Sequence, residues 1–292
     1  MKIGIQVPEV ERFVPWTEYR AIATAAERGG LDSLWVGDHL LYDLPDGSAR
    51  GPWECWTLLA GLAAVTDTIE LAPLVASTSF HAPAMLAKKA ATVDEISGGR
   101  LTLALGSGWN EREYTAYGFA YDKRVSRFEE AFTIIRTLLR DGSIDLSGEY
   151  YEVRDCVLDP PARPDLPILV GSSGPRMLAI TLPHVDAWNI WFDDYDNDAA
   201  LLADKIAVVD QAAAAAGRDT AEIAKTAALL VQLGDEPVRR NSRNPLIGVD
   251  AMLDAFVVMQ EVGIAHIQLV LDPITVASVD RAADAVQRFR AG

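Results

Sequence analysis

The sequence predicts an α/β protein built as a closed (β/α)8 barrel, a TIM barrel, and three observations favour this fold class. Short apolar runs rich in β-branched residues alternate with Ala-rich stretches of helical periodicity, about every 30 to 40 residues. Eight runs and eight helical stretches are present. A doubly wound open sheet is the alternative, but a loop from Pro8 to Pro15 follows the first run where that fold has a GxGxxG turn.

The expected strands are short, as buried parallel strands are. They cover residues 3–7, 33–37, 69–73, 101–106, 168–171, 187–190, 227–233 and 266–271.

The expected helices follow these strands, and glycines such as Gly29, Gly98, Gly217 and Gly263 mark their ends. They cover residues 17–28, 52–66, 83–97, 126–140, 175–182, 197–216, 249–262 and 276–290.

Three stretches do not fit the simple repeat: residues 41–51, 141–166 and 234–248. Insertions after the strands of a barrel usually build its pocket. The middle stretch has the alternation of a hairpin followed by a proline-rich segment. Because it lies between a helix and the next strand, it is also placed to cap the opposite end of the barrel.

Composition narrows the classes of function. The chain of 292 residues is 50% apolar and 23% charged, and we expect a single barrel domain over residues 1–292. A net charge of −16 without a basic run argues against nucleic acid as a partner. No apolar run is long enough to span a membrane, so we expect a cytoplasmic protein. Cys55 and Cys156 form no CxxC pair, so neither a disulfide framework nor a metal site is expected.

The second expected strand ends in Asp38 and His39, at the barrel end where reactive side chains project. Histidine titrates near neutral pH and a neighbouring carboxylate can orient it, which suits proton transfer coupled to redox chemistry. The structural alternative is that Asp38 caps a turn in which His39 packs.

Glycine-rich turns end the fourth and fifth expected strands, where backbone amides can approach a ligand. Glu111 follows the first turn as a second acid or base candidate, and Arg176 follows the second turn, near a helix start, as a phosphate ligand. Ordinary helix caps use the same residue types. The expected cofactor-binding residues of the two turns are Gly106, Ser107, Gly108, Trp109, Gly171, Ser172 and Ser173.

Motifs of other enzyme classes are missing from the sequence: it has no HExxH, no GxSxG and no Walker loop. Tryptophans near the expected strand ends offer flat surfaces, although core packing explains most of them equally well. A flat cofactor that carries a phosphate therefore agrees best with the residues.

Several ordered motifs resemble the luciferase-like monooxygenases, specifically their deazaflavin-dependent oxidoreductases. The resemblance covers nearly the whole chain and is carried by residues 35–39, 82–100, 105–109, 124–130, 148–151 and 170–171. It implies a barrel that binds a flavin-type ring, here coenzyme F420, at its C-terminal mouth. His39 would transfer the proton, Asp38 would contact the ring and Glu111 would be the acid of related dehydrogenases. The residues before the third expected helix, with His81 where many members have arginine, depart from the family pattern.

The resemblance also implies a non-prolyl cis peptide behind the ring, within Leu74, Val75 and Ala76. It leads to three hypotheses of function. The first is an oxidoreductase that transfers a hydride between coenzyme F420 and a small organic substrate. The second is an FMN-dependent monooxygenase that uses molecular oxygen, and the third is a flavin-binding relative without turnover. The sequence leaves the substrate open, and it leaves the choice between a monomer and a homodimer open.

Overall fold

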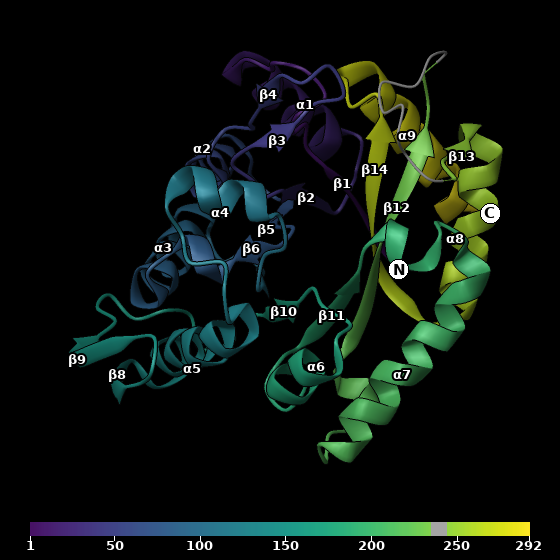
Figure 1. Cartoon of the computed structure of the whole chain (residues 1–292). Coiled ribbons are helices and arrows are strands. Elements are labelled where there is room, and N and C mark those ends of the chain that lie inside the picture. Colours follow the sequence, from purple (N-terminus) through teal and green to yellow (C-terminus); the bar gives the residue numbers. More distant parts are fainter. Residues whose placement is uncertain (235–243) are drawn as a thin grey trace.

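The computed structural model describes residues 1–234 and 244–292, without the side chain of Ile247. It confirms the α/β barrel, in which parallel strands alternate with helices that cover the outside (Figure 1). The main sheet has the order β5-β2-β1-β14-β12-β11-β10-β7-β6. These strands are β1 (Lys2–Gln6), β2 (Ser33–Val36), β5 (Glu70–Pro73), β6 (Ala76–Ser77), β7 (Leu103–Gly106), β10 (Ile168–Val170), β11 (Ala187–Ile190), β12 (Ala224–Gln232) and β14 (Ile264–Asp272).

Strands β5 and β6 together occupy the third position of the barrel, interrupted at Leu74 and Val75. β6 pairs with β7 in parallel, and a bridge between Leu71 and Leu101 joins β5 to the same neighbour. The sheet therefore closes on itself. The resulting barrel has eight strand positions, because β5 and β6 share one of them. The first and last positions, β1 and β14, also pair in parallel.

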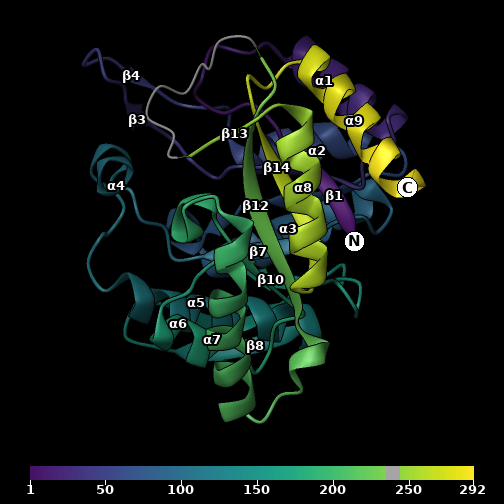
Figure 2. The ribbon, with the colours of Figure 1, turned by 90° about the vertical axis from the view of Figure 1, so that its right-hand side faces the viewer.

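The outer helices are α1 (Trp16–Arg28), α2 (Cys55–Val65), α3 (Pro83–Ser97), α5 (Arg124–Asp141), α6 (Pro175–Thr181), α7 (Leu202–Ala215), α8 (Gly248–Glu261) and α9 (Val276–Ala291). Helix α2 begins three residues later than expected, because the Glu54 carboxylate caps it by accepting the Trp56 and Thr57 amides. Helices α1 and α9, from the two ends of the chain, pack side by side (Figure 2). The short helix α4 (Glu111–Tyr117), which starts directly after the β7 turn, was not expected.

The barrel is buried on both faces of its sheet, which explains why its strands read as continuous apolar runs. The larger cluster of buried side chains lies between sheet and helices. A smaller one inside the barrel consists of Trp35, Ala72, Leu74, Ala104 and Leu169. Because this inner cluster fills the lumen, a ligand site is left to the C-terminal ends of the strands and the loops that follow them.

Two of the three expected insertions are hairpins. Residues 41–51 contain β3 (Tyr42–Asp43) and β4 (Ala49–Arg50), at the C-terminal mouth of the barrel. Residues 141–166 contain β8 (Ser143–Ser147) and β9 (Glu152–Val157). Of the third insertion, residues 235–243 lie outside the described chain, and β13 (Leu246–Ile247) pairs with β12.

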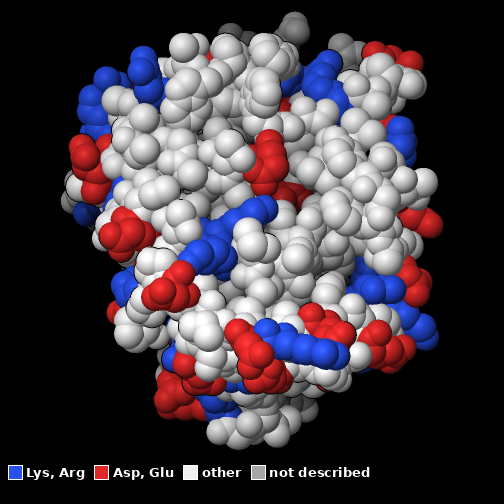
Figure 3. All heavy atoms as spheres, turned by 90° about the vertical axis from the view of Figure 1, so that its left-hand side faces the viewer, with Lys and Arg blue, Asp and Glu red and all other residues white. Residues whose placement is uncertain are grey.

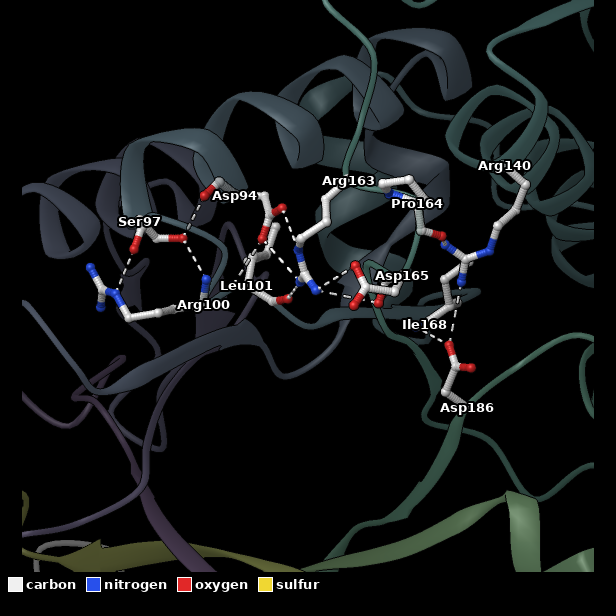
Figure 4. A network of polar contacts seen from close by, with 10 residues as sticks. All are labelled: Asp94, Ser97, Arg100, Leu101, Arg140, Arg163, Pro164, Asp165, Ile168 and Asp186. Atoms are coloured by element: carbon white, nitrogen blue, oxygen red, sulfur yellow. Dashed lines mark hydrogen bonds and ion pairs between the residues drawn. The ribbon is translucent and has the colours of Figure 1, made fainter.

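The proline-rich segment after β9 is tied to the opposite end of the barrel (Figure 4). The Arg163 guanidinium donates to both carboxylate oxygens of Asp94, at 3.0 and 3.3 Å, and Asp94 also accepts the amide of Leu101. A second carboxylate, Asp186, accepts the amide of Ile168 at the start of β10. This insertion therefore caps the N-terminal end of the barrel and takes no part in the mouth.

Candidate active site

A cavity of about 1320 Å³ opens at the C-terminal ends of the barrel strands. Loops after β1, β2, β7, β10 and β11 line it together with the β3–β4 hairpin. The loops come from distant parts of the sequence, and the parallel strands bring them to one end of the barrel. The cavity is large enough for a flat three-ring cofactor together with a small substrate.

His39 lies at the wall of this cavity, paired with Glu113 of α4. Its Nδ1 lies 3.0 Å from Oε2 of Glu113. Because an ionised carboxylate can only accept, Nδ1 carries the hydrogen, and Nε2 is the ring nitrogen that this pairing leaves available. Glu113 is fully buried and also accepts the backbone amides of Leu40 and Leu41. The pair is thus a histidine oriented by a fixed carboxylate.

The surroundings shift both pKa values of this pair. Burial lowers the pKa of His39, but the hydrogen bond to Glu113 and the negative charges of Glu9, Glu113 and Asp38 raise it, and its net shift is upward. Burial raises the pKa of Glu113, whereas its bonds from His39 and the two backbone amides lower it, and its net shift is downward. The pair therefore holds a proton on His39 to a higher pH than a free imidazole would.

The expected acid, Glu111, does not reach this site. It is the first residue of α4 and is exposed, outside the cavity lining. Glu113, two residues further along the same helix, points inward. Its position three residues after the N-cap Asn110 is typical of a capping box, a sequence signal that could have singled it out.

Asp38 is buried in the cavity wall. Its Oδ2 accepts the amide of Ser77 at 2.8 Å and faces Nε2 of His81 at 3.0 Å. Nδ1 of His81 lies 3.4 Å from Nζ of Lys89, which leaves Nε2 as the donor to Asp38. His81 therefore directs a hydrogen-bond donor at Asp38.

A non-prolyl cis peptide joins Leu74 to Val75, within the segment where the sequence resemblance placed it. Both residues line the cavity, whereas Ala76 is buried outside it. The Val75 side chain projects between two glycines: a Cβ on Gly106 or on Gly171 would lie 2.8 Å from one of its methyl groups. The two glycines of the expected turns therefore make room for the valine at the cavity wall.

The remaining expected cofactor residues divide into two groups. Ser107, Gly108, Trp109, Ser172 and Ser173 line the cavity. Gly108 has φ +73°, and a Cβ there would meet the Tyr114 hydroxyl, so glycine is required. Arg176, in contrast, is exposed and pairs with Glu129 at 2.8 Å outside the cavity lining.

Sequence reasoning missed polar residues at the cavity floor. Gln6 and Asn189 are buried and line it. Asn189 donates to Thr226 and to Gln268, while Oε1 of Gln6 has no hydrogen-bond partner in the described chain. Each of these two residues is a polar residue near the C-terminal end of an otherwise apolar strand, and this pattern in the sequence could have indicated them.

Three further observations concern metals, membranes and charged partners. Among residues 1–234 and 244–292, no set of three His, Cys, Asp or Glu side chains is grouped to hold a metal ion. The described helices include none with the length and apolarity needed to cross a bilayer. On the face shown in Figure 3, acidic and basic side chains are interspersed, and no continuous basic area is visible.

Comparison with known proteins assigns the family. The model of the luciferase-like monooxygenase family matches residues 3–287. The chain belongs to this family. The chain is similar to the pyrimidine monooxygenase RutA of Methylorubrum populi, with 33% identity over 65% of this chain and 48% of that protein. RutA of Methylorubrum extorquens is 31% identical over 80% of this chain and 59% of that protein. The chain thus spans about half to three fifths of the length of these relatives.

Several solved structures share the fold over essentially the whole chain. An F420-dependent secondary alcohol dehydrogenase with an F420–acetone adduct has a TM-score of 0.83 at 17% identity, covering 99% of this chain and 98% of that one. A riboflavin lyase with modified FMN has 0.81 at 15% identity, covering 100% and 92%. The monooxygenase RslO1 of Streptomyces bottropensis has 0.79 at 19% identity, covering 99% and 98%. At these identities the likeness concerns the fold alone.

Proposed function

We propose that the protein is an oxidoreductase that transfers a hydride between coenzyme F420 and a small organic substrate, with His39 moving the accompanying proton. The observation that carries the proposal is the pairing of His39 with the buried Glu113 at the wall of the cavity. A structural histidine does not need a dedicated buried carboxylate and an Nε2 left for a ligand. An acid or base in a redox site needs both.

The residues present fit a flavin-type ring. Val75, held between Gly106 and Gly171, offers a convex apolar surface against which a planar ring can lie. The buried Oε1 of Gln6 and Oγ of Ser77 lack partners in the described chain, as expected of groups that bond to a ligand. When bound, the deazaflavin supplies the carbon that accepts or releases the hydride.

The polar groups around Val75 would orient the ring. The carboxylate of Asp38, held by Ser77 and His81, faces the cavity as an acceptor. The backbone amides of Ser172 and Ser173 bond to no group of the described chain, and amides at such a turn attract a phosphate. Arg176, which pairs with Glu129, is left out of this proposed phosphate site.

The proton step belongs to His39. In the reducing direction, protonated Nε2 gives a proton to the substrate atom that becomes an alcohol or amine, and the imidazolium is stabilised by Glu113 until that moment. In the oxidising direction, neutral Nε2 takes the same proton. Glu113 itself stays ionised, because its lowered pKa and its three donors favour the carboxylate.

The test of the proposal is a parallel titration of the purified protein with coenzyme F420 and with FMN. We expect coenzyme F420 to bind more tightly, and the bound form to be reduced or oxidised by a substrate without oxygen. Tighter binding of FMN would overturn the choice of cofactor. Binding without any hydride transfer over a broad panel of alcohols, ketones, amines and imines would instead favour the hypothesis of a non-catalytic relative.

An FMN-dependent monooxygenase is the second candidate, favoured by the name of the relatives at 31% and 33% identity, pyrimidine monooxygenase. This candidate predicts oxygen consumption that depends on substrate and reduced FMN. The two candidates therefore differ in one readout, since hydride transfer with coenzyme F420 proceeds under anaerobic conditions and oxygen insertion does not.

A further inference from the structure

A lysine outside the lining of the main cavity faces His81. Helix α3 begins at Pro83, two residues after His81, and its Lys89 places Nζ 3.4 Å from Nδ1 of the imidazole. This ammonium group has no other hydrogen-bond partner in the described chain. Because an ammonium group can only donate, Nδ1 is kept as an acceptor and the ring hydrogen stays on Nε2. Lys89 thus selects the tautomer of His81.

The surroundings of His81 fix its imidazole. The side chain is 8% exposed, and the ring of Trp56 lies edge-on to it, with the ring centroids 6.5 Å apart. The backbone amide of His81 donates to the carbonyl of Thr78, in the 3-10 turn Thr78–Phe80 that precedes it. With the backbone and the ring both held, Nε2 faces Oδ2 of Asp38 at 3.0 Å. The donor and the acceptor are therefore preorganised.

The two carboxylate oxygens of Asp38 have different surroundings. Oδ2 accepts both from the amide of Ser77 and from His81, and the side chain as a whole is only 2% exposed. Oδ1 has no hydrogen-bond partner in the described chain, although Asp38 lines the main cavity. Buried polar atoms of this kind are usually bonded to protein, water or ligand. Oδ1 is therefore the acceptor that remains for an N–H group of a ligand.

His81 also lines a second, smaller cavity, of about 250 Å³. Phe80 lines both cavities, whereas Asp38 lines only the larger one. The imidazole thus lies between the carboxylate that faces the main cavity and the space of the second cavity. A small molecule in the second cavity can therefore reach the place that a truncated side chain at position 81 would leave empty.

We propose that His81 is a positioning residue, which orients Asp38 so that Oδ1 accepts from an N–H group of the bound cofactor ring, and that Lys89 keeps the His81 hydrogen on Nε2 for this purpose. The proposal rests on the proposed function in one respect, namely that such a ring occupies the cavity. His81 and Lys89 do not touch the ring, and they act on it through Asp38. A histidine that only filled space would need neither a donor aimed at a carboxylate nor a lysine at its other nitrogen.

Nitrogen-15 NMR of the cofactor-free protein tests the tautomer. The chain has four histidines, and the signals that disappear in His81→Gln identify those of His81. At about pH 8, where a free imidazole is neutral, we expect the hydrogen on Nε2 and none on Nδ1. Lys89→Met should let part of the hydrogen move to Nδ1. Lys88→Met is the matched control, because Nζ of Lys88 donates instead to the carbonyl of Asp159, and it should leave the His81 signals unchanged. A hydrogen on Nδ1 in the wild type would overturn the proposal.

Titration with coenzyme F420 tests the positioning. His81→Ala should weaken binding about tenfold, because the carboxylate loses the donor that orients it. His81→Gln, which keeps an N–H donor at the end of the side chain, should stay within about threefold of the wild type. Adding His81→Ala to Asp38→Asn should weaken binding no further, since His81 acts through the carboxylate. The same loss with and without that carboxylate would contradict the proposal.

Added imidazole separates a missing donor from a missing volume. Free imidazole can enter the second cavity of His81→Ala and should restore most of the lost affinity, while leaving the affinity of the wild type unchanged. The compound 1-methylimidazole has nearly the same shape but no N–H group in its neutral form, so it should not restore binding. Equal restoration by both compounds would show that the position needs volume and not a donor.

The same measurements separate this inference from the proposed function. Suppose that coenzyme F420 does not bind, whereas FMN binds and its affinity follows the expected order of the His81 variants. His81 then keeps its positioning role, and the proposed cofactor is wrong. If coenzyme F420 binds equally well to the wild type and to His81→Ala, the proposed cofactor stands and the positioning role is wrong.

Discussion

Nδ1 of His39 lies 3.0 Å from Oε2 of Glu113, a carboxylate that is fully buried and bonded to two backbone amides. The loop after β2 and the helix after β7 supply the two residues, more than 70 positions apart in the chain. The amides of Leu40 and Leu41 fix the position of the Glu113 carboxylate, and this carboxylate in turn fixes the orientation of the His39 imidazole. This relationship leads directly to the first three predictions.

His39→Ala should remove the proton-transfer group and leave the barrel folded, because a side chain at the mouth contributes little to the core. Turnover is expected to fall by about 10²–10⁴-fold, while cofactor affinity stays within about threefold, because most of the proposed cofactor contacts lie elsewhere. Steady-state turnover together with cofactor titration measures both. Full turnover with an unchanged pH profile would assign the proton step to another group.

Glu113→Gln should lower the pKa of His39, because it removes the negative partner that holds the pKa above the ordinary value of 6.5. The limb of the pH–rate profile that reports His39 should therefore move to lower pH. Glu111→Gln, in the same helix but exposed, is the matched control and should leave the profile where it is. The opposite result, in which Glu111→Gln shifts the pH–rate profile and Glu113→Gln does not, would assign the role to Glu111, the glutamate that the sequence indicated.

The same pair predicts how stability depends on pH. The folded pKa of His39 is raised, so its contribution is complete below about 6.5 and is lost as the pH rises through the folded value. The folded pKa of Glu113 is lowered, so its contribution is present above about 4.5 and is lost as the pH falls through the folded value. Urea unfolding should thus show the largest deficit of Glu113→Gln relative to the wild type between these two pH values. A deficit that grows steadily above pH 7 would contradict the ion pair.

Gly171→Ala should weaken cofactor binding by pushing Val75 out of its place, since the new Cβ would lie 2.8 Å from Cγ1 of Val75. An overpacked contact of this kind costs about 1–3 kcal/mol. Adding Val75→Ala removes the clashing methyl groups, so the double variant should be more stable than Gly171→Ala alone. Cofactor titration and thermal unfolding of the two single variants and the double variant form the measurement. If the effects of Gly171→Ala and Val75→Ala on stability were additive in the double variant, Gly171 would not be needed to make room for Val75.

Asp94→Asn should destabilise the protein by about 1–3 kcal/mol, because Asp94 is buried and bonds to both Arg163 and the amide of Leu101 (Figure 4). Asp165→Asn is the control: this residue bonds to the same guanidinium, but its side chain is 81% exposed, and the expected loss is under about 1 kcal/mol. The free energy of unfolding in urea measures both. Equal losses would mean that the segment is not held at the barrel end through Asp94.

The alternation of strands and helices was predictable because every repeat buries one apolar strand and one apolar helix face, and both periods are visible in the residue order. Element ends were less predictable. The helix expected from residue 197 begins at Leu202, because Ala199–Leu201 form a 3-10 turn capped by Asp198. Helix α4 escaped notice because its seven residues are too few for a clear helical period.

By itself the sequence determined the barrel, the end of the barrel that carries the site, and His39 and Asp38 as residues at that end. These follow from local patterns, since the strand that a residue ends decides which end of the barrel it reaches. The position of the cis peptide was implied by the family resemblance and not by a local pattern. Only the tertiary structure decided that Glu113 and not Glu111 meets His39, that Arg176 turns away to Glu129, and that Val75 fills the space of two missing side chains. Each of these depends on the distance between segments far apart in the chain, and no pattern along one segment contains that distance.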